Sequence, residues 1–352
     1  MSTVDDVATT AATQARPEVP AAVERVRGLV EPAMRAAVES IPDQRMRLIA
    51  AYQLGWCDAE GQPTRAGGKA IRPTLAVLAA EAVGGESAAG VPVAAAVELV
   101  HNFSLLHDDI MDRDVERRHR PTGWVAFGEG QAILAGNAML AAAIEIVLRD
   151  SPHAERVLPE LLSTVQLLIG GQSEDLALEQ RDDATVAEVL AMEAGKTGAL
   201  IAGSLAGGAL AAGADADAVA RLAEAGRQLG QAFQLVDDLL GIVGDPAVTG
   251  KSASSDVRAG KRSAPVVAAL RSQTSAGADL AALLADGPPE SDEDVARAVE
   301  LIVAAGGVQC AADDAQRLLD SALTELEAAV GADGGAVAEL QEMARFLVHR
   351  VW

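Results

Sequence analysis

The chain has 352 residues, with 28 basic and 51 acidic side chains and a formal net charge of −23 at pH 7. This charge excludes long-range attraction to nucleic acid or to an anionic membrane surface, so an anionic substrate would need local clusters of Arg and Lys or a bound metal. Half of the residues are hydrophobic but only 2% are aromatic, and the abundance of Ala and Leu favours helices over strands.

Residues 1–20 are rich in Ala and Thr and show no apolar periodicity, so we expect a disordered N-terminal lead. Few Pro- or Ser-rich linkers divide the remainder, so we expect residues 21–352 to form one all-α domain. The apolar periodicity predicts helices at 21–40, 42–55, 72–83, 91–111, 131–149, 152–180, 185–212, 214–243, 264–272, 294–305, 308–330 and 334–350. The segment 131–149 is apolar on nearly all sides, as a buried helix would be. No strand-like alternation or repeat of 20–50 residues is evident.

The cysteines and the apolar stretches indicate the cellular compartment in which we expect the protein. Cys57 and Cys310 are the only cysteines and lie far apart in the chain, so neither a disulfide framework nor a cysteine metal site is indicated. The N-terminus lacks the pattern of a signal peptide. The stretch Ala199–Gly213 is too short and too rich in Gly and Ala to span a bilayer, which predicts a closely packed core helix. We therefore expect a cytoplasmic protein without a transmembrane segment.

Acidic side chains end an apolar helical run at Asp108, Asp109 and Asp112. Asp108 and Asp112 are four residues apart and share one helix face, with His101 on nearly the same line. Carboxylates that close repel one another, and a hard divalent cation such as Mg²⁺ offsets that cost. Basic residues follow within a dozen positions, at Arg113, Arg117, Arg118 and Arg120. The combination predicts a metal-bridged polyphosphate site.

The same arrangement occurs a second time, because Asp237 and Asp238 lie within an apolar helix that precedes a basic loop. The basic residues of this loop are Lys251, Arg258, Lys261 and Arg262. Three other aspartate pairs have ordinary interpretations: 5–6 lie in the lead, 182–183 suit a helix start, and 313–314 suit a solvated helix face. Two half-sites that face each other across a cavity explain the repeated design more simply than two unrelated ion-pair networks.

An ordered series of motifs resembles the trans-isoprenyl diphosphate synthases, the family of farnesyl and geranylgeranyl diphosphate synthases. The resemblance covers most of residues 65–265 and is strong because the motifs occur in order. They are Gly67-Gly68-Lys69-x-x-Arg72-Pro73, His101, Asp108-Asp109-x-x-Asp112, Arg117-Arg118 with Pro121-Thr122, Gly171-Gln172-x-x-Asp175, Lys196-Thr197, Phe233-Gln234-x-x-Asp237-Asp238, Gly250-Lys251, Ser255-Asp256 and Gly260-Lys261. The resemblance implies an isoprenoid synthase fold, in which long helices surround a deep central cavity, and a homodimer.

The resemblance also implies roles for these residues. An allylic diphosphate would bind between the two motifs through about three Mg²⁺ ions, held by Asp108, Asp109, Asp112, Asp237 and Asp238. The allylic diphosphate would contact Arg117, Lys196 and Lys251, with Lys261 closing over it. Isopentenyl diphosphate would be held without metal by Lys69, Arg72, His101 and Arg118. The allylic cation would be stabilised and oriented by Thr197, Gln172 and Gln234, and the proton would leave with the released diphosphate.

Product length in this family depends on the side chains one helical turn below the first aspartate motif, here Phe103 and Ser104. Aromatic residues at both positions favour a product of fifteen carbons. Small Ser104 leaves more room while Phe103 still limits it, which favours geranylgeranyl diphosphate, with farnesyl diphosphate next.

Two positions depart from the family pattern. Gly241 stands where the second motif usually has a third aspartate, and Asn137 stands where Asp commonly follows Gly136. We expect Gly241 to weaken metal binding without abolishing it, because the resemblance assigns direct metal contact to Asp237. Asp245 is a candidate for contact through water.

Other functions remain open. A class I terpene cyclase shares the fold, but its second metal site needs Ser or Thr four residues after Asn or Asp. Asn102 and Asn137 are followed by Leu106 and Ala141 at that distance, and Asp237 by Gly241. The alternative of a weakly active regulatory or scaffold subunit is supported only by Gly241 and Asn137. A metal-dependent phosphohydrolase is disfavoured because no general base is evident beside the aspartate pairs.

Overall fold

The computed structural model describes residues 18–64, 68–178, 181, 183–244 and 254–349. Within them, strands are limited to a two-stranded antiparallel ribbon, β1 (Glu116–Arg117) and β2 (Arg120–Pro121), with one isolated bridge between Cys57 and Pro63. The helices are α2 (Ala21–Glu39), α3 (Gln44–Gln53), α4 (Ile71–Ala82), α5 (Ser87–Met111), α6 (Gly123–Phe127), α7 (Glu129–Asp150), α8 (Ala154–Leu178), α9 (Val186–Glu193), α10 (Ala199–Ala211), α11 (Ala216–Val243), α13 (Ser255–Arg258), α14 (Ala264–Arg271), α15 (Ser275–Leu283), α16 (Asp292–Ala304), α17 (Gly307–Val330) and α18 (Gly335–Val348). The prediction of an all-α fold is confirmed.

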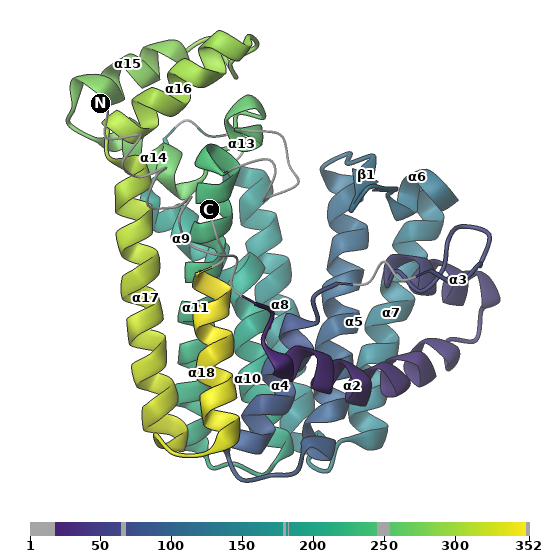
Figure 1. Cartoon of the computed structure of the whole chain (residues 1–352). Helices are drawn as coiled ribbons and strands as arrows, with labels where there is room; N and C mark the ends of the chain where they lie inside the picture. The colour runs from purple at the N-terminus through teal and green to yellow at the C-terminus, as the bar shows by residue number, and fades with distance from the viewer. Residues whose placement is uncertain (1–17, 65–67, 179–180, 182, 245–253, 350–352) are drawn as a thin grey trace.

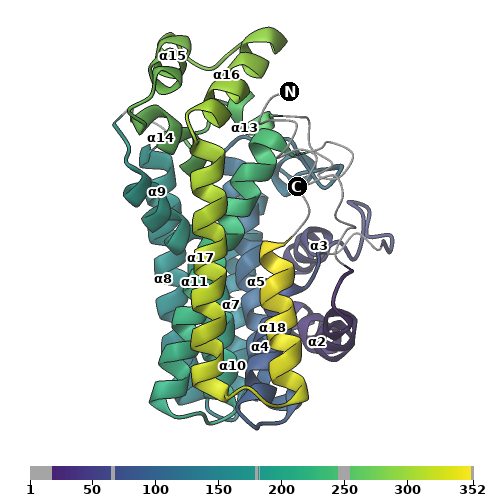
Figure 2. The same ribbon diagram turned by 60° about the vertical axis from the view of Figure 1, so that its left-hand side comes forward.

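The long helices run roughly side by side in one bundle, with α2 crossing them and α14–α16 beyond one end (Figures 1 and 2). Helix α10 occupies the middle of the bundle, because it packs against α4, α5, α8 and α11. Glycines let these helices approach closely: a Cβ atom placed on Gly208 would overlap the carbonyl oxygen of Ala76 in α4. Nearly every residue of α10 is buried. The prediction of a closely packed core helix at Ala199–Gly213 is therefore confirmed.

Buried apolar side chains form two clusters. One joins α2, α3, α5, α7 and α8, and the other joins α9, α11 and the helices from α13 to α18. Helices α2, α4, α8 and α10 contribute to both clusters. The first aspartate motif therefore stands on a helix of one cluster, and the second motif stands on a helix of the other.

Several predicted boundaries shift. The helix predicted at 185–212 contains a π-helical turn at Ala194–Gly198, which separates α9 from α10. The loop predicted at 244–262 contains the short helix α13. Helix α15 and the ribbon β1–β2 were not predicted, because nine residues and two residues per strand carry little periodic signal. The predicted lead falls mostly on residues 1–17, outside the described residues.

Helix α7 is wrongly predicted as buried on nearly all sides. Its side chains Ile133, Leu134 and Leu148 are exposed. By length and composition alone, α5 and α7 could each cross a membrane, as could the bent pair α16 and α17 taken together. In the fold, 67% of the most apolar 18-residue stretch of α5 is buried, but only 44% of the corresponding stretch of α7. The apolar surface of α7 is thus only partly used within this chain.

Candidate active site

A cavity of 1320 Å³ gathers most of the predicted site residues. Its walls come from α4, α5, α8, α9, α11, α13, α14 and α16, together with the π-helical turn, the ribbon β1–β2, the segment before α4 and the loop after α15. The predicted residues that line it are Lys69, Arg72, His101, Asp108, Asp112, Arg117, Arg118, Lys196, Thr197, Gln234, Asp237, Asp238 and Lys261. Lys251 and Asp245 lie outside the described residues. The cavity thus combines two acidic motifs with basic side chains, as the sequence predicted.

Lys196 lies next to the first aspartate motif. Its Nζ atom is 2.5 Å from Oδ2 of Asp175 and 3.4 Å from Oδ1 of Asp108. Burial opposes the positive charge, but the carboxylates of Asp108 and Asp175 outweigh it and raise the pKa of Lys196. Asp175 belongs to a family motif, but its sequence position alone gave no role. In the structure it positions the Lys196 ammonium beside Asp108.

The π-helical turn places Lys196 and Thr197 at the cavity. It packs backbone against backbone on α8, since a Cβ atom on Gly171 would overlap the backbone nitrogen of Lys196. Such turns insert an extra residue into a helix and are frequent at functional sites. Gln172, which was predicted beside the allylic cation, does not line the cavity, and its Nε2 is buried without a hydrogen-bond partner in the described structure.

A hydrogen-bond chain links the π-helical turn to the second aspartate motif. Thr197 Oγ1 donates to Gln234 Oε1 at 3.0 Å, and Gln234 Nε2 donates to Asp238 Oδ1 at 3.0 Å. The backbone N–H of Ala264 also donates to Asp238, at 3.2 Å. Asp238 is 1% exposed, so protein donors hold it. Asp237, its neighbour, also lines the cavity.

Glu193 is a buried neighbour of Asp238 that sequence reasoning missed. Burial and the adjacent Asp238 carboxylate raise the pKa of Glu193 well above its ordinary value. The Glu193 carboxyl is therefore disposed to be protonated beside Asp238, and burial raises the pKa of Asp238 as well, against the opposing effect of Lys261. The available signal was an acidic residue within an apolar helix, three positions before Lys196.

Basic side chains gather at another part of the cavity, where Arg72 and Arg118 lie near His101 and Glu98. Burial and these arginines hold the pKa of His101 well below its usual range, so its imidazole is neutral. Burial raises the pKa of Glu98 against the opposing effect of Arg72. Lys69 also lines this region. The arrangement can bind an anion through charged donors without a metal.

The ribbon β1–β2 presents the arginine pair. Arg118 and His119, the two residues between the strands, both have left-handed backbone conformations, with φ of 54° and 59°, as a tight two-residue hairpin turn requires. The turn places Arg118 over Gly68, where a Cβ atom would lie 3.2 Å from the guanidinium. Gly68 therefore allows Arg118 to approach the segment that carries Lys69.

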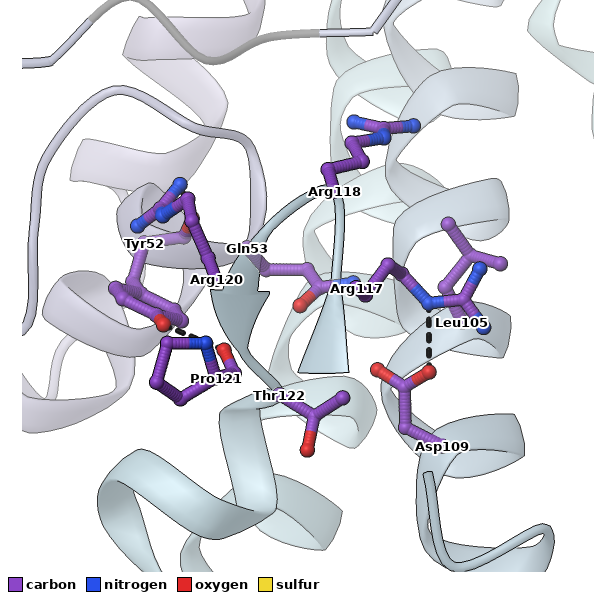
Figure 3. Close-up of a pocket in the computed structure, with 9 residues that line it drawn as sticks. All are labelled: Tyr52, Gln53, Leu105, Asp109, Arg117, Arg118, Arg120, Pro121 and Thr122. Atoms are coloured by element: carbon purple, nitrogen blue, oxygen red, sulfur yellow. Dashed lines mark hydrogen bonds and ion pairs between the residues drawn. The ribbon is translucent and has the colours of Figure 1, made fainter. Parts of the chain in front are cut away.

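Asp109 faces the ribbon, not the large cavity. Arg117 Nε donates to its Oδ1 at 2.6 Å, and the Asp109 side chain is 1% exposed. Figure 3 shows Arg117 turned toward Asp109, while Arg118 points away from it. Across the same small pocket, Arg120 stacks on Tyr52, whose hydroxyl donates to the carbonyl of Pro121. Asp109 therefore anchors the arginine ribbon to α5.

Phe103 and Ser104 do not line the described cavity. Phe103 is buried, with its ring edge-on to His107 at 5.1 Å between centroids. His107 Nε2 lies 3.1 Å from the carbonyl oxygen of Ile133 in α7. Ser104 Oγ donates to the carbonyl of His101 at 2.8 Å. Phe103 thus packs toward α7, and the role of both residues in product length stays a prediction.

The carboxylates of the cavity suit hard divalent cations whose remaining oxygen ligands come from a bound substrate. Among the described residues, no group of three or more His, Cys, Asp or Glu could by itself hold a metal ion. Yet Asp108 Oδ1 is buried and accepts no hydrogen bond, with only its ion pair to Lys196 at 3.4 Å, and Asp112 and Asp237 line the same cavity. These carboxylates provide an incomplete oxygen set that Mg²⁺ tolerates when substrate phosphates supply the remaining ligands.

Comparison with known proteins identifies the family. The model of the family described as "Polyprenyl synthetase" matches residues 58–302. The chain belongs to the polyprenyl synthetase family. Among curated relatives of this polyprenyl synthetase is a (2E,6E)-farnesyl diphosphate synthase of Mycobacterium tuberculosis, 44% identical over 92% of the chain and 90% of the relative. A geranylgeranyl diphosphate synthase of the same organism is also 44% identical, over 88% of the chain and 89% of the relative.

Solved structures agree with this assignment. A polyprenyl synthetase from Streptomyces coelicolor A3(2) superposes with a TM-score of 0.87 at 45% identity, over 93% of this chain and 99% of that one. A geranylgeranyl pyrophosphate synthase from Corynebacterium glutamicum, described as complexed with calcium and isoprenyl diphosphate, has a TM-score of 0.78 at 30% identity, over 95% and 98% of the two chains. This polyprenyl synthetase has the isoprenoid synthase fold and is a short-chain trans-prenyltransferase.

Proposed function

We propose that the chain condenses isopentenyl diphosphate with an allylic diphosphate, head to tail and with Mg²⁺, to give geranylgeranyl diphosphate. The observation that carries this proposal is the single cavity lined by both aspartate motifs and by two groups of basic side chains. One basic group lies beside the aspartates, at Lys196 and Lys261, and the other surrounds His101. Two diphosphates, one with metal and one without, match these two environments.

The allylic diphosphate would lie between α5 and α11. Asp108, Asp112 and Asp237 would hold the Mg²⁺ ions, which supply Lewis-acid and electrostatic stabilisation of the leaving diphosphate. Lys196 would then exchange part of its contact with Asp108 for a diphosphate oxygen, while Asp175 keeps it in place. Lys261 would approach from the segment after α13, and Arg117 from the ribbon.

Isopentenyl diphosphate would be held by Arg72, Arg118 and Lys69. The planar guanidinium binds phosphate oxygens two at a time. His101, kept neutral by these arginines, can donate one hydrogen bond without adding a further charge. This binding leaves the double bond free to attack the allylic carbon from which diphosphate departs.

The oxygen dipoles of polar side chains in the cavity would stabilise the allylic cation. The oxygens of Thr197 and Gln234 are linked by their hydrogen bond and line the cavity. Attack by the double bond forms the new carbon–carbon bond, and the proton lost afterwards passes to the released diphosphate. Gln172 lies outside the cavity lining, so its part in this step would be indirect.

The preference for twenty carbons is supported by Ser104, the small residue one turn before Asp108. Relatives named for fifteen-carbon and twenty-carbon products match this chain at the same identity, so similarity alone favours neither. Phe103 would still limit the length by occupying the space between α5 and α7.

We also propose that the protein is a soluble, cytoplasmic homodimer. Exposed apolar side chains gather on two neighbouring helices, namely Ile133, Leu134 and Leu148 on α7 and Leu162, Leu167 and Ile169 on α8. Pairing of these faces between two copies would bury the surface of α7 that this chain leaves open.

The deciding experiment is mass spectrometry of products made by the purified chain from isopentenyl diphosphate, Mg²⁺ and either dimethylallyl, geranyl or farnesyl diphosphate. We expect a twenty-carbon diphosphate that requires Mg²⁺ and is lost in Asp108→Ala. The exposed residue Asp279 on α15 provides the control Asp279→Ala, with the same change of charge and no loss expected. A free hydrocarbon would instead indicate a cyclase, and no product with any primer would indicate a regulatory subunit.

A further inference from the structure

Gly241 lies one helical turn after Asp237, on the same face of α11. A side chain at this position would point toward the carboxylate of Asp256. A Cβ atom placed on Gly241 would lie 2.9 Å from Oδ1 of Asp256 and would overlap its Cγ and Oδ2 atoms. The Asp256 carboxylate therefore occupies the space that the first side-chain atom of residue 241 would need.

Asp256 reaches this position because α13 is tied to α11. Ser254 Oγ donates to the carbonyl of Ile242 at 3.0 Å, and Val257 is buried in the apolar cluster that contains α11. The backbone N–H of Lys261 donates to the carbonyl of Asp256 at 2.9 Å, which closes the turn after α13. These contacts fix the Asp256 backbone beside the face of α11 that carries Asp237.

The Asp256 side chain lines the large cavity and is 16% exposed. Lys261 Nζ lies 3.7 Å from its Oδ2 and 3.6 Å from Oδ1 of Asp238. Burial opposes the charge of Lys261, but Asp238 and Asp256 outweigh it and raise its pKa. An ion pair with Lys261 alone would not require residue 241 to lack a side chain, whereas entry of the carboxylate against α11 does.

We propose that Asp256 supplies the third carboxylate of the second aspartate motif, and that Gly241 is the gap that admits it. The motif is thus divided between two segments, with Asp237 and Asp238 on α11 and the remaining acid on α13. This inference rests on the proposed function, because the ligand is the metal–diphosphate group of the same cavity. Asp256 acts on that group directly or through bound water, together with Lys261.

The test uses Mn²⁺ and inorganic diphosphate as probes, with bound Mn²⁺ measured by electron paramagnetic resonance and affinity by calorimetry. Asp256→Ala should weaken Mn²⁺ binding in the presence of diphosphate by about 10- to 100-fold, the usual effect of losing a group that supports a metal site. Gly241→Asp should also weaken it, because the new side chain collides with Asp256. The double variant Gly241→Asp/Asp256→Ala should recover most of the affinity, since the acid returns to α11. The two effects are then strongly non-additive.

Gly241→Ala provides a second route if Gly241→Asp does not fold. Its single methyl group displaces the Asp256 carboxylate without adding charge, so we expect the same loss of Mn²⁺ binding with an unchanged circular dichroism spectrum. Asp279→Ala serves as the control for loss of one acidic charge. Unchanged Mn²⁺ affinity in Asp256→Ala, or a double variant no better than the two single variants, would overturn the inference.

Asp108→Ala separates this inference from the proposed function. If the unaltered chain binds Mn²⁺ with diphosphate and Asp108→Ala abolishes that binding, the proposed site stands whatever the behaviour of residues 241 and 256. If the unaltered chain does not bind the two probes together, the proposed function and this inference both fail.

Discussion

The ammonium nitrogen of Lys196 lies 2.5 Å from Oδ2 of Asp175. This ion pair joins the π-helical turn to α8 and keeps a positive charge beside Asp108. A lysine held by two carboxylates stands in for part of the positive charge that the metal would bring. It would also remain available to a diphosphate if a metal bound Asp108.

Removing the charge of Asp175 should therefore impair turnover more than binding of isopentenyl diphosphate. We expect Asp175→Asn to lower kcat by about 10- to 100-fold, with the KM for isopentenyl diphosphate nearly unchanged, because Lys196 shifts toward Asp108. Steady-state kinetics with both substrates varied measures this split. Glu174→Gln, at an exposed neighbour on α8, is the matched control. Equal changes in both variants would contradict a positioning role for Asp175.

Ser104→Phe should shorten the product. The aromatic ring would fill space about 6 Å below Asp108 along α5, so growth would stop at fifteen carbons. Phe103→Ser should have the opposite effect and lengthen the product, because it removes the ring that packs against His107. Mass spectrometry of the products checks both. An unchanged product distribution in Ser104→Phe would remove this residue from the control of chain length.

A charge on the exposed face of α7 and α8 should separate the proposed dimer. Leu134 and Leu167 are 54% and 57% exposed, and burial of a glutamate at either position would cost several kcal/mol, on the order of the penalty for an unpaired buried charge. We expect Leu134→Glu and Leu167→Glu to sediment as monomers. Leu29→Glu, on the exposed side of α2, makes the same change elsewhere and should leave the dimer intact. A monomeric parent chain would contradict the proposal.

Stability should rise with pH in the range governed by His101. Its pKa in the folded chain is held well below the unfolded value near 6.5, so the unfolded chain binds the proton first as the pH falls. The contribution of His101 is thus present above about pH 6.5 and is lost below it, at up to about 1.4 kcal/mol per pH unit. Urea unfolding between pH 5 and 8, where the ordinary histidine pKa falls, measures the slope.

His101→Asn should make this pH dependence shallower, because it removes the titrating group. His119→Asn is the control, since His119 is 86% exposed. An identical slope in His101→Asn and the parent chain would show that other groups govern the pH dependence.

Helix packing around α10 gives a prediction that does not involve the active site. Gly208→Ala should destabilise the fold by about 1–3 kcal/mol, because its Cβ would overlap the carbonyl oxygen of Ala76. Gly28→Ala, in α2 with no atom near its Cβ position, should instead be neutral or stabilise by up to about 1 kcal/mol. Chemical unfolding monitored by circular dichroism compares them. A stable Gly208→Ala variant would show that α4 and α10 can move apart at little cost.

The sequence predicted those parts of the site that depend on local spacing. The four-residue interval puts Asp108 and Asp112 on one helix face, and the repeated motif places Asp237 in the same cavity. Both follow from helix geometry and from the electrostatic cost of adjacent carboxylates. Family motifs then predicted most of the basic residues around the cavity.

What the sequence could not predict depends on contacts between distant segments. The position of Asp256 against Gly241 requires the path of the chain between α11 and α13. The pairing of Asp109 with Arg117 requires the turn of the ribbon. Composition also could not tell whether the apolar residues of α7 pack inside one chain or against a second copy, since both situations favour the same side chains.

The two aspartate motifs stand on helices of different apolar clusters, and α2, α4, α8 and α10 contribute to both clusters. A ligand that binds both motifs would therefore bridge these two parts of the interior. Its binding energy adds directly to the free energy of unfolding, by about 2.7 kcal/mol at a ligand concentration one hundred times Kd. Binding of the proposed ligand would therefore make the thermal stability of this protein depend on the ligand concentration.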